Sequence, residues 1–322
     1  MCRQLNVKEA DPTPASASPS GTHLPAFTAR RLTPSTFLIK EWDDLWGEHP
    51  FIYAKIVPAA QTILLLDTGC GGQTNNPNID LKDLRKFIET VPVNDNDGKP
   101  LNPGGKLSYI VVQSHCHYDH ILGVEAFAVD SPILGSSHDP TFASPENLST
   151  HSLCDKLGVR TPSYKLELVL HLHSITSTSG VPLGVRVLHT PGHTPDELAL
   201  WDAKESMLYV GDTLYEDEPI IFPEEGSLPT WFSTIDDLLS FVRNQPNASQ
   251  VKINCGHATA MKPAIDVLEA TKRFMNDVVS GKEPLRGRCQ RKGVWIVEYK
   301  QETGRFSLRC PESLVLEARN PA

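Results

Sequence analysis

Long apolar runs are missing from this chain of 322 residues. Its longest runs, such as Ile63 to Leu66, fall far short of the roughly 20 residues that a membrane-spanning helix needs. The first ten residues are polar and of mixed charge, unlike a secretory signal. We therefore expect no membrane partner and no secretory route.

Basic charge is also scarce. The sequence holds 30 Lys and Arg against 39 Asp and Glu, which gives a net charge of −9. A chain with this balance lacks the general attraction of basic proteins to phosphate backbones and anionic lipid. The composition therefore argues against nucleic acid as a partner.

Cysteine is present without an ordered pattern. No two cysteines have Cys-x-x-Cys spacing, which argues against a zinc ribbon and a thioredoxin-type redox site. Their number is odd and they are scattered, at Cys2, Cys70, Cys116, Cys154, Cys255, Cys289 and Cys310. We expect free thiols in a reducing compartment, and hence a cytoplasmic protein.

The rest of the pattern indicates a short arm and one mixed α/β domain. Residues 11–20 read DPTPASASPS, which offers too little apolar surface to offset the entropy of ordering. We predict a flexible arm over residues 1–26 and a single domain over 27–322. Long loops are expected over 130–165. Runs rich in β-branched and aromatic residues predict strands at 36–40, 51–57, 62–67, 109–113, 185–190, 198–202 and 207–211. Helical apolar spacing predicts helices at 79–90, 235–244 and 265–279, and a closing hairpin is expected from 294–300 and 305–309.

A histidine cluster directly follows the strand expected at 109–113. It reads His115-Cys116-His117-Tyr118-Asp119-His120. In an extended segment alternate side chains point the same way, so His115 and His117 can chelate one ion together. Asp119 and His120 follow where the chain turns into a helix, and they can face a second ion. Imidazole with carboxylate and no thiolate suits Zn²⁺, although iron, manganese and nickel accept similar ligands.

One cluster cannot complete the coordination of two metal ions, so further ligands must come from other parts of the chain. The candidates are His193, Asp212 and His257, each at the end of an expected strand. A glycine stands immediately before each of them, which would let the backbone approach a crowded site.

HCHYDH followed by Gly-His, Gly-Asp and Gly-His resembles the metallo-β-lactamase-fold hydrolase superfamily. The turn Asp67-Thr68-Gly69 after an apolar strand is similar too. The resemblance covers residues 30–280 and implies an α/β fold, a four-layer αβ/βα sandwich with a dinuclear metal site at one edge.

The resemblance also implies a role for each ligand. The first metal would take His115, His117 and His193, the second Asp119, His120 and His257, and Asp212 would bridge them. Two zinc ions per chain are expected, with iron or manganese as alternatives. His117 stands where flavodiiron-type relatives carry Glu, so oxygen or nitric oxide reduction is not expected.

The substrate expected from the resemblance is a small cyclic amide or ester. Tyr215 lies three residues after Asp212, and N-acyl-homoserine lactonases of the superfamily are similar in placing a Tyr there. Its hydroxyl would bond the substrate carbonyl as negative charge develops. The chain also resembles a fungal branch that hydrolyses benzoxazolinone-type lactams. PGHTPDELALW and GDTLYEDEP are also similar to thioesterase and glyoxalase II relatives, so thioester hydrolysis is the alternative.

In the mechanism expected from the seven metal ligands and Tyr215, a metal-bound hydroxide attacks the carbonyl carbon of the substrate. Asp119 orients this hydroxide and then carries its proton to the leaving group. No Gly-x-Ser-x-Gly elbow is present, in agreement with a mechanism without a covalent enzyme intermediate. The alternative that is not an enzyme is a metal-binding sensor or scaffold, which would bind metal but hydrolyse no substrate. Oligomeric state is left open.

Several other residues have competing interpretations. Asp67 is expected to orient a ligand histidine, and Cys116 to point away from the ions. His171 and His173 are expected on a solvated strand, and His189 in the core or behind a ligand. Core packing and a wall around an apolar substrate remain open for the aromatic residues Trp42, Trp46, Trp231 and Phe232.

Overall fold

The computed structural model describes residues 24–320 and contains two large sheets. The first sheet is antiparallel from β2 to β5 and parallel from β5 to β9. Its strand order is β2 (Phe27–Arg31), β3 (Thr36–Glu41), β4 (Phe51–Val57), β5 (Thr62–Leu66), β7 (Ser108–Val112), β8 (Ile133–Ser136) and β9 (Leu166–Val169). The second sheet has the order β10 (Ser174–Thr176), β11 (Pro182–His189), β12 (Leu198–Asp202), β13 (Met207–Tyr209), β15 (Lys252–Asn254) and β16 (Lys262–Pro263).

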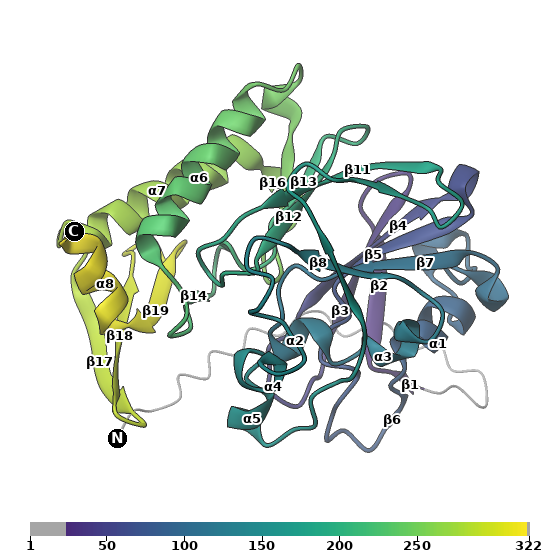
Figure 1. Ribbon diagram of the computed structural model, residues 1–322, viewed down its shortest axis with the longest axis horizontal. Helices are drawn as coiled ribbons and strands as arrows, with labels where there is room; N and C mark the ends of the chain where they lie inside the picture. The colour runs from purple at the N-terminus through teal and green to yellow at the C-terminus, as the bar shows by residue number, and fades with distance from the viewer. Residues whose placement is uncertain (1–23, 321–322) are drawn as a thin grey trace.

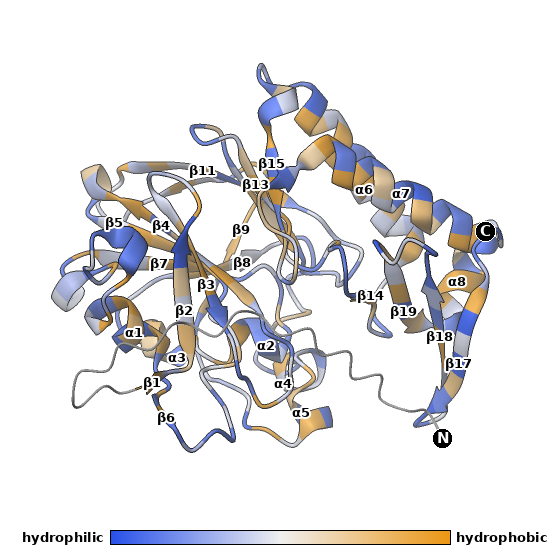
Figure 2. Ribbon diagram, turned by 180° about the vertical axis from the view of Figure 1, so that it is seen from behind, coloured by the Kyte–Doolittle hydropathy of each residue, from blue (hydrophilic) through white to orange (hydrophobic). Residues whose placement is uncertain are grey.

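The two sheets face each other, and helices cover their outer faces (Figure 1). One apolar cluster joins Leu64 and Val112 of the first sheet to Val187 and Leu200 of the second. The outer face of the first sheet packs on α1 (Leu84–Thr90) and α3 (Glu125–Ala128). The outer face of the second packs on α6 (Leu228–Arg243) and α7 (Ala264–Val279). The predicted four-layer αβ/βα sandwich is therefore confirmed, and Figure 2 shows the apolar residues concentrated on the strands and on one side of these helices.

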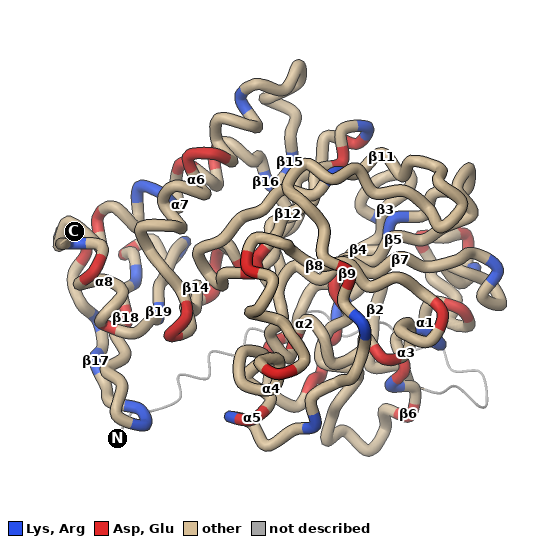
Figure 3. Tube along the Cα trace, in the orientation of Figure 1, with Lys and Arg blue, Asp and Glu red and all other residues tan. Residues whose placement is uncertain are grey.

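A third sheet lies beyond α6 and α7. Its order is β14 (Pro219–Ile221), β19 (Ser307–Pro311), β18 (Val294–Lys300) and β17 (Leu285–Arg291). The predicted hairpin is confirmed as β18 and β19, which pair antiparallel. The sheet packs through Val297 and Leu308 on α6, α7 and the last helix, α8 (Glu312–Arg319). Figure 3 shows basic residues along β17, its exposed edge strand.

Two predicted helices have different bounds. The segment 79–90 begins as strand β6 (Ile79–Leu81), which pairs in parallel with β1 (Leu24–Pro25). The helix α1 starts only after Asp83, whose carboxylate accepts a hydrogen bond from the Lys86 N–H and caps it. In the other case α6 begins seven residues before the predicted 235, because Ser227 caps it.

The remaining expectations concern the loops and termini. The 130–165 segment holds β8 and two one-turn helices, α4 (Leu148–His151) and α5 (Cys154–Leu157), within loops. Of the predicted arm, residues 1–23 lie outside the described residues. Within 24–320 all six cysteines are free, as expected. In the same range no helix combines the length and the apolar character that a membrane span requires.

Candidate metal centre

All seven predicted ligands come together at one edge of the sandwich. His115 and His117 follow β7, and the one-turn helix α2 (Tyr118–Ile121) carries Asp119 and His120. The other three come directly after strands or strand ends of the second sheet, namely His193 after β11, Asp212 after β13 and His257 after β15. Each of the seven is at most 7% exposed. The side chains form two groups, with ligand atoms within 4.8 Å of one another in each.

The first group contains only imidazoles. His115 Nε2 lies 2.9 Å from His117 Nδ1, which lies 3.2 Å from His193 Nε2. Burial and the neighbouring rings lower the pKa of His117 to about 3. Burial likewise lowers the pKa of His193 to about 4 and that of His115 well below its usual value. The three rings are therefore neutral at pH 7, and each has a lone pair to offer.

The second group combines two carboxylates with two imidazoles. His257 Nε2 is 3.2 Å from Asp119 Oδ2 and 3.4 Å from Asp212 Oδ2. His120 Nε2 is 3.5 Å from Asp119 Oδ2 and 3.4 Å from Asp212 Oδ1. Burial favours neutral rings, but Asp119 and Asp212 outweigh it and raise the pKa of both histidines well above the usual value. This group therefore attracts positive charge.

A divalent cation fits the donor set of both groups. Among the described residues, the buried His120 Nε2 and Asp212 Oδ1 have no hydrogen-bond partner, although such atoms are normally paired. The glycine before His257 is needed for this close packing. A Cβ on Gly256 would overlap Asp212 Oδ1 and come within 2.9 Å of His120 Cε1.

Asp67 orients the ligands from behind, as predicted. Its Oδ2 accepts hydrogen bonds from His120 Nδ1 at 2.9 Å and from Ser114 Oγ at 2.8 Å. Because the Ser114 hydroxyl donates to Asp67, its oxygen is free to accept from His115 Nδ1, 3.0 Å away. Both histidines are thereby held with Nε2 as the ligand atom.

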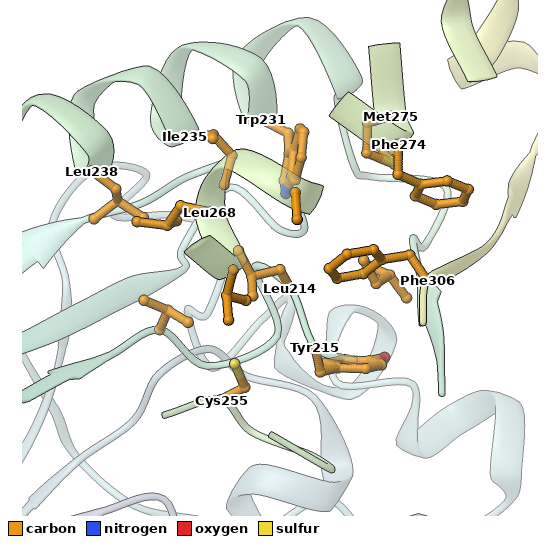
Figure 4. Packing of buried hydrophobic residues seen from close by; sticks show 14 of the residues in the cluster. Leu214, Tyr215, Trp231, Ile235, Leu238, Cys255, Leu268, Phe274, Met275 and Phe306 are labelled. Atoms are coloured by element: carbon orange, nitrogen blue, oxygen red, sulfur yellow. The ribbon is translucent and has the colours of Figure 1, made fainter. Parts of the chain in front are cut away.

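Tyr215 lies beside the second group. Its ring packs against His257 with centroids 5.4 Å apart, and its hydroxyl accepts a hydrogen bond from the Ile221 N–H at 3.3 Å. Figure 4 shows Tyr215 at the edge of the core that contains Leu214 and Trp231. Both interpretations of this residue are therefore compatible with its position.

The remaining cysteine and histidine candidates lie away from the two ligand groups or behind them. Cys116 packs with Phe142 and Leu148, away from the ligands, as expected. His171 and His173 are exposed as expected, but they lie on a turn after β9 rather than on a strand. His189 is half-buried and lies 2.9 Å from the Val169 carbonyl oxygen through Nε2.

The aromatic candidates divide between core and site. Trp231 is fully buried on α6 and donates to the Thr213 carbonyl oxygen at 2.6 Å, so it belongs to the core. Phe232 packs against the same core, and Trp42 packs against the outer core of the first sheet. Trp46 instead contacts Tyr118 of α2, with ring centroids 5.2 Å apart.

Sequence reasoning missed Glu197. Its fully buried carboxylate accepts a hydrogen bond from the Asp212 backbone N–H at 2.7 Å. The contact fixes the turn that presents Asp212. An acidic residue four positions after His193 was the available signal, but its partner lies 15 residues further along the chain.

Comparisons with known proteins agree with this fold. Residues 102–248 match the family described as “Metallo-beta-lactamase superfamily”. A solved structure of a metallo-beta-lactamase family protein from Thermus thermophilus is similar with a TM-score of 0.56 and 16% identity. That likeness covers 80% of this chain and 85% of the other.

Two curated relatives have different names. A protein of Aspergillus versicolor named “Putative transcription factor avaE” is 34% identical over 91% of this chain and 89% of its own length. The human protein named “Acyl-coenzyme A thioesterase MBLAC2” is 23% identical over 58% of this chain and 67% of its own length. The chain therefore has the metallo-β-lactamase fold, and its residues 102–248 carry the match to the metallo-β-lactamase superfamily.

Proposed function

We propose that this protein is a hydrolase that opens a small cyclic amide or ester, a lactam or a lactone, with two zinc ions. The observation that carries the proposal is the complete and buried ligand set in two adjacent groups. In the proposed site one ion binds to His115, His117 and His193. The other binds to Asp119, His120 and His257. Asp212 would also hold metal, since its carboxylate lies among the ligand atoms of the second group, 3.4 Å from both His120 Nε2 and His257 Nε2.

Bound divalent ions would lower the pKa of water and polarise a carbonyl group. The chain's own residues supply the remaining steps. Asp119 accepts, at its carboxylate, the proton released as water attacks the carbonyl carbon, and it returns that proton to the leaving nitrogen or oxygen. Tyr215 donates its hydroxyl proton in a hydrogen bond to the carbonyl oxygen as negative charge develops there.

The surroundings of the site favour a small and partly apolar substrate. Aromatic rings lie beside the ligands, with Phe222 next to His193 at 5.9 Å and Tyr215 next to His257. A small ring with one polar carbonyl fits such surroundings.

Thioester hydrolysis is the second candidate, because the human relative is named an acyl-coenzyme A thioesterase. The other name, that of a transcription factor, suggests nucleic acid binding. The net charge of −9 argues against that function, and the buried ligand set gives it no support.

The experiment is a matched substrate panel with metal-loaded protein. The panel contains a γ-lactone, a benzoxazolinone-type lactam, a β-lactam and an acyl-coenzyme A thioester. Asp119→Ala removes a proposed ligand and proton carrier. Asp217→Asn is the control, because Asp217 is exposed and lies only two residues from Tyr215.

We expect ring opening by the wild type and by Asp217→Asn, and its loss in Asp119→Ala. Thioester cleavage alone would favour the second candidate. Bound metal without turnover of any panel member would contradict the proposal and favour a binding role.

A further inference from the structure

The loop over residues 42–50, between β3 and β4, contacts both sides of the second ligand group. On one side the Glu48 carbonyl oxygen accepts a hydrogen bond from His257 Nδ1 at 2.8 Å. On the other side the Glu48 carboxylate accepts one from the Tyr118 hydroxyl at 2.6 Å. Tyr118 lies between His117 and Asp119 on the ligand-bearing segment.

The contact with His257 determines which nitrogen can bind a metal. A backbone carbonyl only accepts, so His257 Nδ1 must carry the proton. The lone pair is then on Nε2, the atom that faces Asp119 and Asp212. A metal-ligating histidine is commonly held in this way by its second nitrogen.

Asp44 gives the loop its shape. Its Oδ1 accepts hydrogen bonds from the backbone N–H groups of Trp46 at 3.0 Å and Glu48 at 3.1 Å. Its Oδ2 accepts one from the His49 N–H at 2.7 Å. The loop includes two residues with positive φ, Gly47 at 75° and His49 at 50°. Glycine adopts a positive φ freely, but His49 holds this backbone only when its surroundings fix it, and the Asp44 side chain, itself 0% exposed, supplies these bonds.

We propose that Asp44 is a positioning residue for the second metal. It holds the peptide of Glu48 in place, the Glu48 carbonyl fixes the tautomer and direction of His257, and His257 then presents Nε2. This inference rests on the proposed function, because it assumes that the second group binds a metal. It adds a residue that lies outside the ligand set and acts through the Glu48 carbonyl on His257.

The test is metal binding rather than activity. Metal-free protein is titrated with Zn²⁺ against a chromophoric chelator, and the affinities of the two equivalents are fitted separately. For Asp44→Ala we expect the second equivalent to bind about 10- to 100-fold more weakly, as for other partners of ligand histidines. The first equivalent should be unchanged.

Two further variants provide an intermediate case and a control for the weaker binding of the second equivalent. Asp44→Asn keeps an oxygen that can accept from the Trp46 and Glu48 N–H groups, so its loss should be smaller. Asp43→Asn is the matched control, because Asp43 bonds the Asn76 side chain and not the backbone of the loop. It should bind both equivalents as the wild type does. Thermal unfolding of the metal-free variants shows whether each is folded.

A double-mutant cycle shows whether Asp44 acts through His257. In a His257→Ala background, Asp44→Ala should cause no further loss of the second equivalent. The inference would be overturned if Asp44→Ala weakened the second equivalent by the same factor in both backgrounds. It would also be overturned if Asp44→Ala bound the second equivalent with wild-type affinity. A wild type that binds only one equivalent would instead refute the dinuclear part of the proposed function.

Discussion

Tyr215 is the residue whose role depends most on its proton. Burial, followed by the charge of Asp212, raises the pKa of its hydroxyl well above the usual value. The hydroxyl therefore keeps its proton at neutral pH. The Ile221 N–H already uses one of the oxygen lone pairs, so the hydroxyl proton is what Tyr215 can give to a substrate.

Tyr215→Phe separates the two interpretations of this residue. If the hydroxyl bonds the substrate carbonyl, kcat should fall roughly 100-fold or more, as on removal of other oxyanion donors. The metal content should stay at the wild-type value. If Tyr215 only packs, kcat should not change, and stability should fall by about 1 kcal/mol for the lost hydrogen bond. Steady-state kinetics with metal analysis and urea unfolding distinguish these results.

The lowered pKa of the Asp44 carboxyl leads us to expect that the stability of the fold depends on pH. Burial raises the pKa of this carboxyl, but hydrogen bonds from His49 and Glu48 outweigh it and lower the pKa to about 2 from 3.8. A carboxyl with a depressed pKa in the folded state stabilises the fold above its unfolded-state pKa. That contribution, at most about 2 kcal/mol, is lost as the pH falls from about 4 to about 2.

Urea unfolding of the wild type and Asp44→Asn from pH 6 to pH 2 measures this contribution. The difference between the two proteins should be largest at pH 6 and should shrink below pH 4. A difference that does not vary with pH would mean that the charge of Asp44 contributes nothing.

At the scale of elements, the two sheets are also tied together at the end far from the ligands. Lys55 on β4 forms ion pairs with Asp202 at the end of β12 and with Glu205, the latter at 3.3 Å. Glu205 in turn accepts hydrogen bonds from the hydroxyls of Ser35 and Thr36, both at 2.8 Å. Lys55 and Asp202 are buried.

Lys55→Met should therefore destabilise the fold by about 3–5 kcal/mol, because it leaves a buried carboxylate without its partner. Zinc binding at pH 7 should be retained in the folded variant. Urea unfolding gives the change in stability. Adding Asp202→Asn to Lys55→Met should recover part of the loss, and an additive double variant would contradict this explanation.

The elements that sequence reasoning placed correctly are those with a strong local pattern. The strands placed correctly in the two central sheets are β3, β4, β5, β7, β11, β12 and β13, which are short, rich in apolar residues and bounded by turns. The other strands of these sheets, β2, β8, β9, β10, β15 and β16, were not predicted. The start of α6 was missed although Ser227 and Pro229 are local signals for a helix start. The strand β6 could not be recognised, because Leu81 fits the helical apolar pattern and only its pairing with β1 makes it a strand.

The site also contains residues with a local sequence signal and residues that only a long-range contact identifies. Four ligands stand together in the HCHYDH cluster after β7, and His193, Asp212 and His257 each follow a glycine, so each ligand has a local signal. The contact of Glu48 with His257 joins residues 209 positions apart, and the loop that makes it has no pattern of its own. Contacts of this kind depend on the three-dimensional fold and cannot be seen in a single sequence.

At the scale of the whole molecule, the segments that build the site share one sign of charge. Residues 42–50, 115–120, 191–197, 212–225 and 255–261 hold twelve Asp and Glu and no Lys or Arg. The basic residues Arg286, Lys300 and Arg309 instead line a hollow of about 830 Å³ beside the third sheet, and Asp217 and Glu218 of the site segments line the same hollow. Two bound divalent ions would offset only part of the negative charge.

This distribution predicts selection against polyanionic substrates. An acyl-coenzyme A carries several phosphate charges, so its kcat/KM should be lower than that of an uncharged lactone or lactam. Added salt screens the repulsion, so kcat/KM for the acyl-coenzyme A should rise with ionic strength while that of the neutral substrate stays constant.

Charge reversal at the exposed Glu218 tests the same effect without touching the ligands. Glu218→Lys should raise kcat/KM for the acyl-coenzyme A a few-fold, as expected when electrostatic repulsion of a charged ligand is relieved, and leave the neutral substrate unaffected. Glu218→Gln should give half of the effect or less, because it changes the charge by one unit instead of two. If acyl-coenzyme A hydrolysis instead slows as salt is added, the substrate is attracted to the protein. The basic residues of the hollow beside the third sheet would then be the groups to change next.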